Sequence, residues 1–118
     1  IIAKARIDSE ATRLMVLQAA KAMDERGNAE ARVWVSAIKA MVPARVCEII
    51  DEAMQMHGGI GVSQWTPLAR MYASMRTLRL ADGPDEVHWM VVGRAELNGY
   101  EEKVDAEGNA ALAWVRPG

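Results

Sequence analysis

The sequence predicts an all-α protein, arranged as an antiparallel up-and-down four-helix bundle. Apolar residues recur at the helical period through most of the 118-residue chain. Alanine is frequent, eight methionines are present and phenylalanine is absent, a composition that favours helix over sheet. Glycine and proline divide the chain at points where helices would end and begin. The length suits a single domain, so we treat residues 1–118 as one unit.

The first two helices are expected to be long. The first begins at residue 1 and ends within DERGNAEA, where Gly27 is a good residue to follow a helix and Asn28 a good N-cap. The second runs from about residue 29 to 57, because its apolar stripe continues past Pro43. Proline inside a helix removes one hydrogen bond, so Pro43 predicts a kink rather than a break.

The third helix is expected to start at Pro67, with Thr66 as its N-cap, and to stop at Asp82-Gly83. Its buried face is predicted to hold Leu68, Met71, Tyr72, Met75 and Leu78. The fourth helix starts at Pro84 and fades near residues 98–99. The tail that follows could form a short helix or dock as a segment.

Charge and cysteine content narrow the function classes. The net charge is −2 with no basic stripe, which gives nucleic-acid binding no electrostatic basis. No apolar run approaches the roughly 20 residues of a membrane span. The single Cys47 excludes an intrachain disulfide, is read as a small core residue and suits a reducing compartment. A soluble cytoplasmic protein is therefore expected.

Residues 55–61, QMHGGIG, admit two interpretations. Gly58, Gly59 and Gly61 could simply end a helix and form a loop, or their bare backbone could admit a phosphate-bearing ligand. The stretch is not a dinucleotide fingerprint, because a helix precedes it rather than a strand. His57 has no metal-ligand partners at suitable spacing, and a histidine favoured by the helix dipole is the simpler interpretation.

Residues 82–86, DGPDE, also carry two interpretations. The sequence is good turn chemistry, with Asp85 and Glu86 placed to favour the dipole of the next helix. Asp82 is also a candidate general base, since a carboxylate beside an apolar ligand gains a raised pKa. The residues alone leave both open.

The stretch DEAMQMHGGIGVSQWTPLARMYASMRTLRLADGPDEVHWMVVGRAEL resembles the C-terminal helical domain of the acyl-CoA dehydrogenases. The shared pattern covers nearly the whole chain: two long helices, Gln-x-x-Gly-Gly-x-Gly, Pro-Leu-x-Arg-x-Tyr, a third helix and an acid-Gly turn opening the fourth. Each piece is weak alone, but their order and spacing are specific. The resemblance implies a flavoprotein oxidoreductase of fatty acid metabolism that performs FAD-dependent α,β-dehydrogenation of acyl-CoA thioesters.

The resemblance also implies the roles of residues in the acid-Gly turn. The family's catalytic Glu falls on Asp82. Residues 78–88, LRLADGPDEVH, resemble a subgroup of the family that has Asp at this position. Some relatives keep the base on another helix, outside this chain. Gly83 matches a position whose backbone lies against the substrate. The next positions are Pro84, Asp85 and Glu86. Many family members have Thr-x-Gln there, and these residues contact FAD. An ionised Glu86 could not donate the hydrogen bond that the Gln donates.

The resemblance also implies residues that contact the adenosine-diphosphate part of FAD. They are Gln55, Met56, His57, Gly58 and Gly59. In the family, this FAD is often held mainly by a neighbouring subunit. It implies a homo-oligomer, either dimer or tetramer, and an electron-accepting flavoprotein as a candidate redox partner. In a eukaryote the compartment would be the mitochondrion or the peroxisome.

Family members also have an N-terminal helical domain and a middle β-domain, so we expect this chain to be a fragment of a longer enzyme and inactive alone. Exposed apolar surface is expected where missing domains or subunits would cover the bundle. The alternative is a non-catalytic helical bundle for oligomerisation or partner binding.

Overall fold

The structure, a computed structural model, describes residues 1–102, and it places side chains as far as residue 99. Its elements are α1 (Ile2–His57), the short 3₁₀ helix η1 (Gly58–Val62), α2 (Leu68–Thr77) and α3 (Asp85–Glu102). No strand occurs within the described range. The all-α prediction is confirmed, and the rest of the predicted tail lies outside the described residues.

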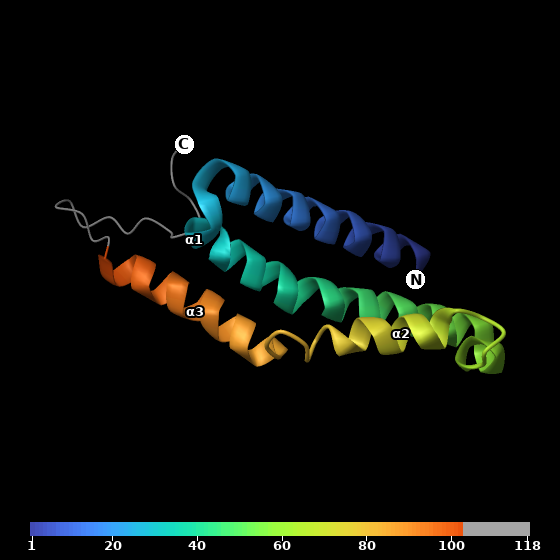
Figure 1. The fold of residues 1–118 in the computed structure, drawn as a ribbon. Helices are drawn as coiled ribbons and strands as arrows, with labels where there is room; N and C mark the ends of the chain where they lie inside the picture. The colour runs from blue at the N-terminus through green and yellow to red at the C-terminus, as the bar shows by residue number, and fades with distance from the viewer. Residues whose placement is uncertain (103–118) are drawn as a thin grey trace.

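α1 is folded into two antiparallel arms at Gly27 (Figure 1). Gly27 has φ 80° and ψ 175°, and it is the only residue inside α1 with non-helical dihedrals. A left-handed φ favours glycine, which is why the chain turns there. The two arms correspond to the first two predicted helices. Helical backbone continues through Pro43, as the apolar stripe predicted.

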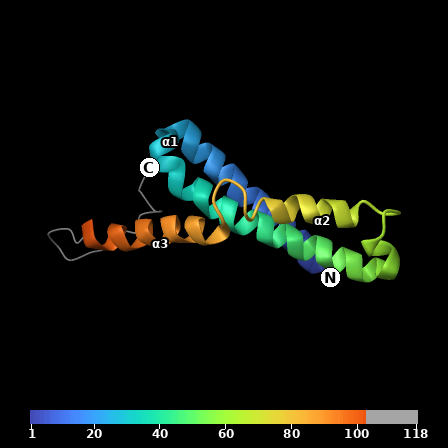
Figure 2. The ribbon, with the colours of Figure 1, turned by 60° about the horizontal axis from the view of Figure 1, so that its bottom comes forward.

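The arrangement of the last two helices, α2 and α3, differs from the prediction. α2 and α3 follow one another along the second arm of α1, and both run opposite to it (Figures 1 and 2). Both helices contact α1, whereas no contact joins α2 to α3 within the described chain. The predicted count of four up-and-down helices is therefore not confirmed, because the last two helices share one layer.

Helix starts near the prolines confirm two predictions and correct a third. α2 begins directly after Pro67, and α3 directly after Pro84 with two acidic residues in its first turn. Thr66 does not cap α2, because no side-chain bond caps that helix and the Thr66 hydroxyl instead lies 3.4 Å from the Gly61 carbonyl oxygen. α3 also continues past Gly99, the predicted end.

The buried core of α1 consists mostly of small side chains. The buried apolar residues are Ala19, Ala22, Ala31, Ala37, Ala40, Cys47 and Ile50. On the second arm, buried positions 36, 40, 43, 47 and 50 alternate in steps of four and three, the spacing of a helix–helix seam. The second arm therefore forms the centre of the molecule, between the first arm and the α2–α3 layer (Figure 1).

Many large apolar side chains remain exposed. No residue of α2 is fully buried, so the predicted buried face of that helix is wrong for Met71 and Leu78, which are 47% and 43% exposed. The first arm exposes Ile7, Leu14 and Leu17. Periodicity identifies the apolar face of a helix, but it does not show whether the same chain covers that face.

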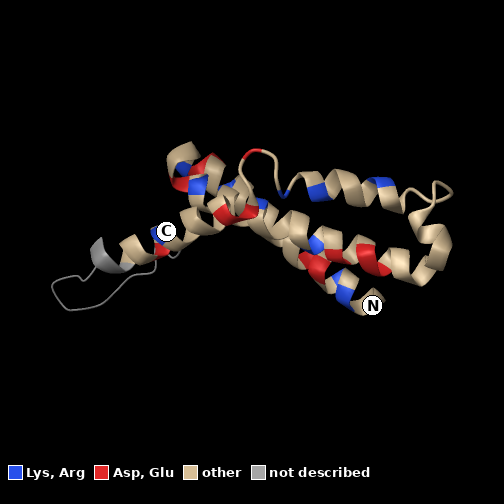
Figure 3. Ribbon diagram, turned by 90° about the horizontal axis from the view of Figure 1, so that it is seen from below, with Lys and Arg blue, Asp and Glu red and all other residues tan. Residues whose placement is uncertain are grey.

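Charged residues are interspersed along the helices (Figure 3). On the first arm, Lys4 pairs with Asp8 at 2.6 Å and Arg13 pairs with Glu10 at 2.9 Å. Lys4 also reaches Glu48 on the second arm at 3.5 Å. These pairs are largely exposed, so each contributes little to stability.

Candidate functional site

The turn between α2 and α3 carries Asp82 and Gly83. Backbone hydrogen bonds continue past the end of α2, with the N–H groups of Leu80 and Ala81 both donating to the Thr77 carbonyl. The chain then reverses at Asp82, with φ 55°, and Gly83, with φ 97°. Asp82 is the only described residue other than glycine with positive φ. The acid-Gly turn therefore depends on two consecutive left-handed residues.

An ion pair closes the base of this turn. The Arg79 Nε donates to Asp85 Oδ2 at 2.7 Å, and the Asp85 backbone N–H donates to the Arg79 carbonyl at 3.1 Å. Asp85 is 8% exposed, whereas Pro84 and Glu86 are exposed. Asp85 thus faces the protein, and any contact with a cofactor would compete with Arg79.

Asp82 lies at an apolar groove of about 530 Å³. The groove runs between the two arms of α1 and the end of α2, and its polar lining residues are Lys39, Asp82 and His88. Its apolar lining consists of Val16, Val35, Ile38, Val42, Pro43, Met75 and Leu78. No hydrogen bond or ion pair joins the Asp82 carboxylate to another described side chain. Asp82 is itself exposed, so an ionisable group stands free at the edge of an apolar groove.

Two further residues, Lys39 and His88, hold this turn. The Lys39 ammonium donates to the carbonyls of Leu78, Ala81 and Gly83, at 2.7 Å for Ala81 and 3.3 Å for Gly83. His88 Nε2 lies 3.1 Å from the Asp82 carbonyl oxygen. Sequence reasoning did not single out either residue, since Lys39 lies on α1 and no local motif links it to the turn.

Contacts of the His88 ring fix its tautomer. A carbonyl oxygen can only accept, so His88 Nε2 must carry the proton that it donates to Asp82. Its Nδ1 lies 3.3 Å from Ser36 Oγ, and in the neutral ring it accepts the hydroxyl proton. Both ring nitrogens are therefore engaged, and Asp82 is the group at the groove that is available to take a proton.

The other predicted site lies at the end of α1. Gln55, Met56, His57, Gly58 and Gly59 are all exposed there. Gly58 has φ 63°, and its N–H donates to the Gln55 carbonyl, so it ends the helix. A Cβ at Gly58 or Gly59 would meet no atom within 4 Å. Gly58 therefore ends the helix as predicted, and the backbone at Gly58 and Gly59 is also open to a ligand.

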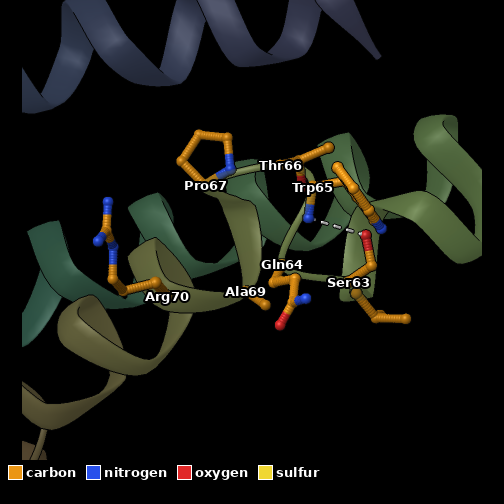
Figure 4. Close-up of a pocket in the computed structure, with 8 residues that line it drawn as sticks. Ser63, Gln64, Trp65, Thr66, Pro67, Ala69 and Arg70 are labelled. Carbon is orange, nitrogen blue, oxygen red and sulfur yellow. Dashed lines mark hydrogen bonds between the residues drawn. The ribbon is translucent and has the colours of Figure 1, made fainter.

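A pocket of about 520 Å³ adjoins this end of α1 (Figure 4). Residues Ser63 to Pro67 form its loop, and Ala69 and Arg70 come from the first turn of α2. The Trp65 backbone N–H donates to Ser63 Oγ at 3.1 Å, and Trp65 is 84% exposed. The pocket offers hydroxyls, an indole and a guanidinium, and the QMHGGIG stretch alone did not predict it.

The structure does not bring the two predicted sites together. The acid-Gly turn packs against Lys39, whereas the glycines lie 19 residues further along α1, about 28 Å away at about 1.5 Å per helical residue. Among the described residues, no cluster could hold a metal ion and no helix is long and apolar enough to cross a membrane.

The all-α fold agrees with the family comparison. Residues 1–97 match the model of the acyl-CoA dehydrogenase C-terminal domain, and the chain belongs to that family.

Individual relatives agree. The chain is 51% identical over 105 residues to acyl-CoA dehydrogenase family member 11 of Rattus norvegicus, covering 89% of this chain and 14% of that protein. It is 48% identical over 97 residues to the probable acyl-CoA dehydrogenase FadE2 of Mycobacterium tuberculosis, covering 82% and 24%. A solved structure assigned to the acyl-CoA dehydrogenases, from Mycobacterium abscessus, superposes with a TM-score of 0.82 at 50% identity, covering 84% of this chain and 24% of that one. The chain thus spans a quarter or less of the length of these relatives.

Proposed function

We propose that this chain acts as the C-terminal domain of an FAD-dependent acyl-CoA dehydrogenase, a longer enzyme that desaturates acyl-CoA thioesters between the α and β carbons. The observation that carries the proposal is the apolar groove with the free carboxylate of Asp82 at its edge. The chain spans a quarter or less of the relatives that it matches, and together with its many exposed apolar side chains this supports a role within a larger protein. Alone, it would be inactive.

Asp82 would act as the general base that removes the α-proton. The apolar groove would hold part of the acyl chain beside this carboxylate. Gly83 places bare backbone beside the base, because its φ of 97° suits glycine. Bound FAD would supply the redox chemistry by accepting the hydrogen from the β carbon.

The end of α1 fits a diphosphate-bearing cofactor. Gly58 and Gly59 leave open space, and the pocket beside them contains Arg70. We assign this surface to the adenosine-diphosphate part of FAD. Pro84, Asp85 and Glu86 would contact a second FAD, because about 28 Å of helix separates the two stretches.

This arrangement requires a homo-oligomer, a dimer or a tetramer, in which the glycine end of one α1 reaches the FAD of a neighbouring subunit. An electron-accepting flavoprotein would then reoxidise the cofactor. We place the complete enzyme in the cytoplasm, or in mitochondria or peroxisomes if its source is eukaryotic.

Replacing Asp82 by Asn tests the base directly. Asn tolerates left-handed backbone at least as well as Asp, so the turn should survive while the proton acceptor is lost. In the full-length flavoprotein, we expect an acyl-CoA to bleach the flavin absorbance of the wild type, and D82N to slow that bleaching by at least about a hundredfold. Replacing the exposed Asp51 by Asn is the matched control. Bleaching at the wild-type rate in D82N would remove Asp82 as the base.

A second candidate function is a non-catalytic helical bundle for oligomerisation or partner binding. The exposed apolar side chains of the first arm favour it, since such surface commonly marks an interface. A colourless full-length protein that remains oligomeric would support this second function. A flavin-containing protein that acyl-CoA reduces would support the first.

A further inference from the structure

The backbone of Asp82 is held in a conformation that its own sequence does not favour. Its φ of 55° lies in the left-handed region, which costs free energy in residues other than glycine. Such a conformation persists only where surrounding contacts impose it. The contacts that impose it also decide where the Asp82 carboxylate points in the groove.

Lys39 supplies most of those contacts from a different element. Its ammonium group has three donors, and three carbonyl oxygens surround it, those of Leu78, Ala81 and Gly83. These carbonyls flank Asp82 on both sides along the chain. Lys39 lies on the second arm of α1, so it ties the turn to the central helix across 39 to 44 residues of sequence.

His88 holds the backbone carbonyl of Asp82 itself. It donates from Nε2 to the Asp82 oxygen, and Ser36 on α1 holds the ring from its other side. A Cβ at Gly83 would lie 3.2 Å from the same Nε2, so the ring packs closely on the turn. Ser36 and Lys39 lie one turn apart on α1, and together they present one surface to the acid-Gly turn.

We infer that Lys39 is a positioning residue for the reaction: it fixes the acid-Gly turn on α1 and thereby aims the Asp82 carboxylate into the groove. The inference rests on the proposed function, in which Asp82 is the base. The Lys39 donors are occupied by backbone oxygens, so Lys39 acts through the turn and not on the substrate. Its loss should reduce the rate of proton removal far more than it reduces acyl-CoA binding.

The test replaces Lys39 by Met in the full-length, flavin-loaded enzyme. Met keeps the apolar stem and removes the ammonium donors. Displacing a catalytic group by about 1 Å costs about a hundredfold in rate, so we expect flavin reduction at saturating acyl-CoA to slow about 10- to 100-fold. The acyl-CoA dissociation constant should change by less than about threefold, because the groove walls are untouched.

A second readout does not depend on turnover. Hydrogen exchange of the backbone amides of residues 80–87 should accelerate about tenfold or more in K39M, since the turn loses its hold on α1. Peptides from residues 48–57 should exchange as in the wild type. Replacing Lys21, an exposed lysine on the first arm, by Met is the matched control and should change neither readout.

A Lys39→Arg variant covers the case in which K39M does not fold. Arg keeps the charge, but its planar fork cannot place one nitrogen among three converging carbonyls. We expect K39R to fold and bind FAD. Its rate of flavin reduction should lie between the wild-type and K39M rates. If K39M does not fold, the K39R rate should be at least about fivefold below that of the wild type.

The outcomes separate the two claims. Wild-type reduction rates in both Lys39 variants, or unchanged exchange in residues 80–87, would overturn the positioning role while the proposed function stands. A wild-type enzyme whose flavin no acyl-CoA reduces would overturn the proposed function, and the positioning role with it. Slowed reduction together with faster exchange confined to the turn would support both.

Discussion

The three glycines of QMHGGIG differ in what the structure demands of them. Gly58 needs its left-handed φ of 63° to end α1. Gly61 is buried against the helix, where a Cβ would lie 2.4 Å from the Met54 carbonyl oxygen. Gly59 has neither constraint, since its φ is not positive and a Cβ there would meet nothing within 4 Å. A requirement for glycine at position 59 would therefore come from a ligand.

Replacing Gly59 by Ala should weaken FAD retention without weakening the fold. The added methyl group has room in the protein, so we expect the melting temperature of the flavin-free enzyme to stay within about 2 °C of the wild type. If the backbone of Gly59 lies against the cofactor, FAD should dissociate about tenfold or more faster. Dilution of the loaded enzyme, followed by flavin fluorescence, measures the release.

A Gly61→Ala variant is the contrasting control for that experiment. Its Cβ would overlap the Met54 backbone, so we expect a loss of about 1–3 kcal/mol in folding stability. FAD retention per folded molecule should change less than in G59A. If G59A holds FAD as well as the wild type, the glycines serve only the helix end and its loop.

At the scale of the elements, sequence patterns predicted most helix starts, but the third helix, expected to reach Asp82-Gly83, ends at Thr77. Gly27, Pro67 and Pro84 mark chain reversals or helix starts because φ freedom and the missing proline N–H act locally. Asp82 and Gly83 were predicted by the same kind of local signal. The shared layer of α2 and α3 was not predicted, since it depends on packing between distant segments.

The groups that surround Asp82 illustrate the same limit. Lys39 reaches the turn across about forty residues, and Ser36 reaches His88 across 52. No periodicity or motif links residues at such separation. The local sequence therefore identified the candidate base, whereas the structure was needed to identify what holds it.

The turn between α2 and α3 should depend on the ion pair at its base. Arg79 to Met would leave the Asp85 carboxylate buried with neither oxygen paired, because Oδ1 already lacks a partner among the described residues. Breaking a buried pair is costly, but the Arg79 side chain is 33% exposed, so we expect a loss of about 1–2 kcal/mol. Thermal melting of the full-length protein measures it.

The double variant R79M/D85N separates charge burial from packing. Removing the charge of Asp85 eliminates the unpaired buried anion, so the double variant should recover at least half of the melting temperature lost by R79M. The single variant D85N completes the comparison. If the double variant loses as much melting temperature as R79M and D85N lose when added together, the pair acts through packing alone.

At the scale of the whole molecule, this chain is long and incompletely covered. It measures 62 × 28 × 25 Å, and its radius of gyration of 17.9 Å exceeds the roughly 13 Å of a compact domain of about 100 residues. Among the residues whose side chains the structure describes, no large side chain is less than 2% exposed, and the buried centre consists mostly of alanines. Because burial of large apolar groups is the main stabilising term, we expect most of this term to come from surfaces outside the chain.

The isolated chain should therefore be helical but loosely packed. We expect strong helical far-UV circular dichroism, broad thermal unfolding without a sharp midpoint and marked binding of the dye ANS. The first arm would drive self-association, since Ile7, Leu14 and Leu17 are each more than half exposed. The double variant L14E/L17E should reduce association in sedimentation velocity, whereas K21E/E25K on the same arm should not.

The same substitutions should have the opposite consequence in the full-length protein. If other domains or subunits cover the first arm, L14E/L17E would bury two charges and should lower the melting temperature by about 5 °C or more, while K21E/E25K should leave it within about 2 °C. Sharp, cooperative unfolding of the isolated chain with little ANS binding would contradict this view. The alanine-rich core would then suffice to fold the domain, and its exposed apolar side chains would need no covering partner.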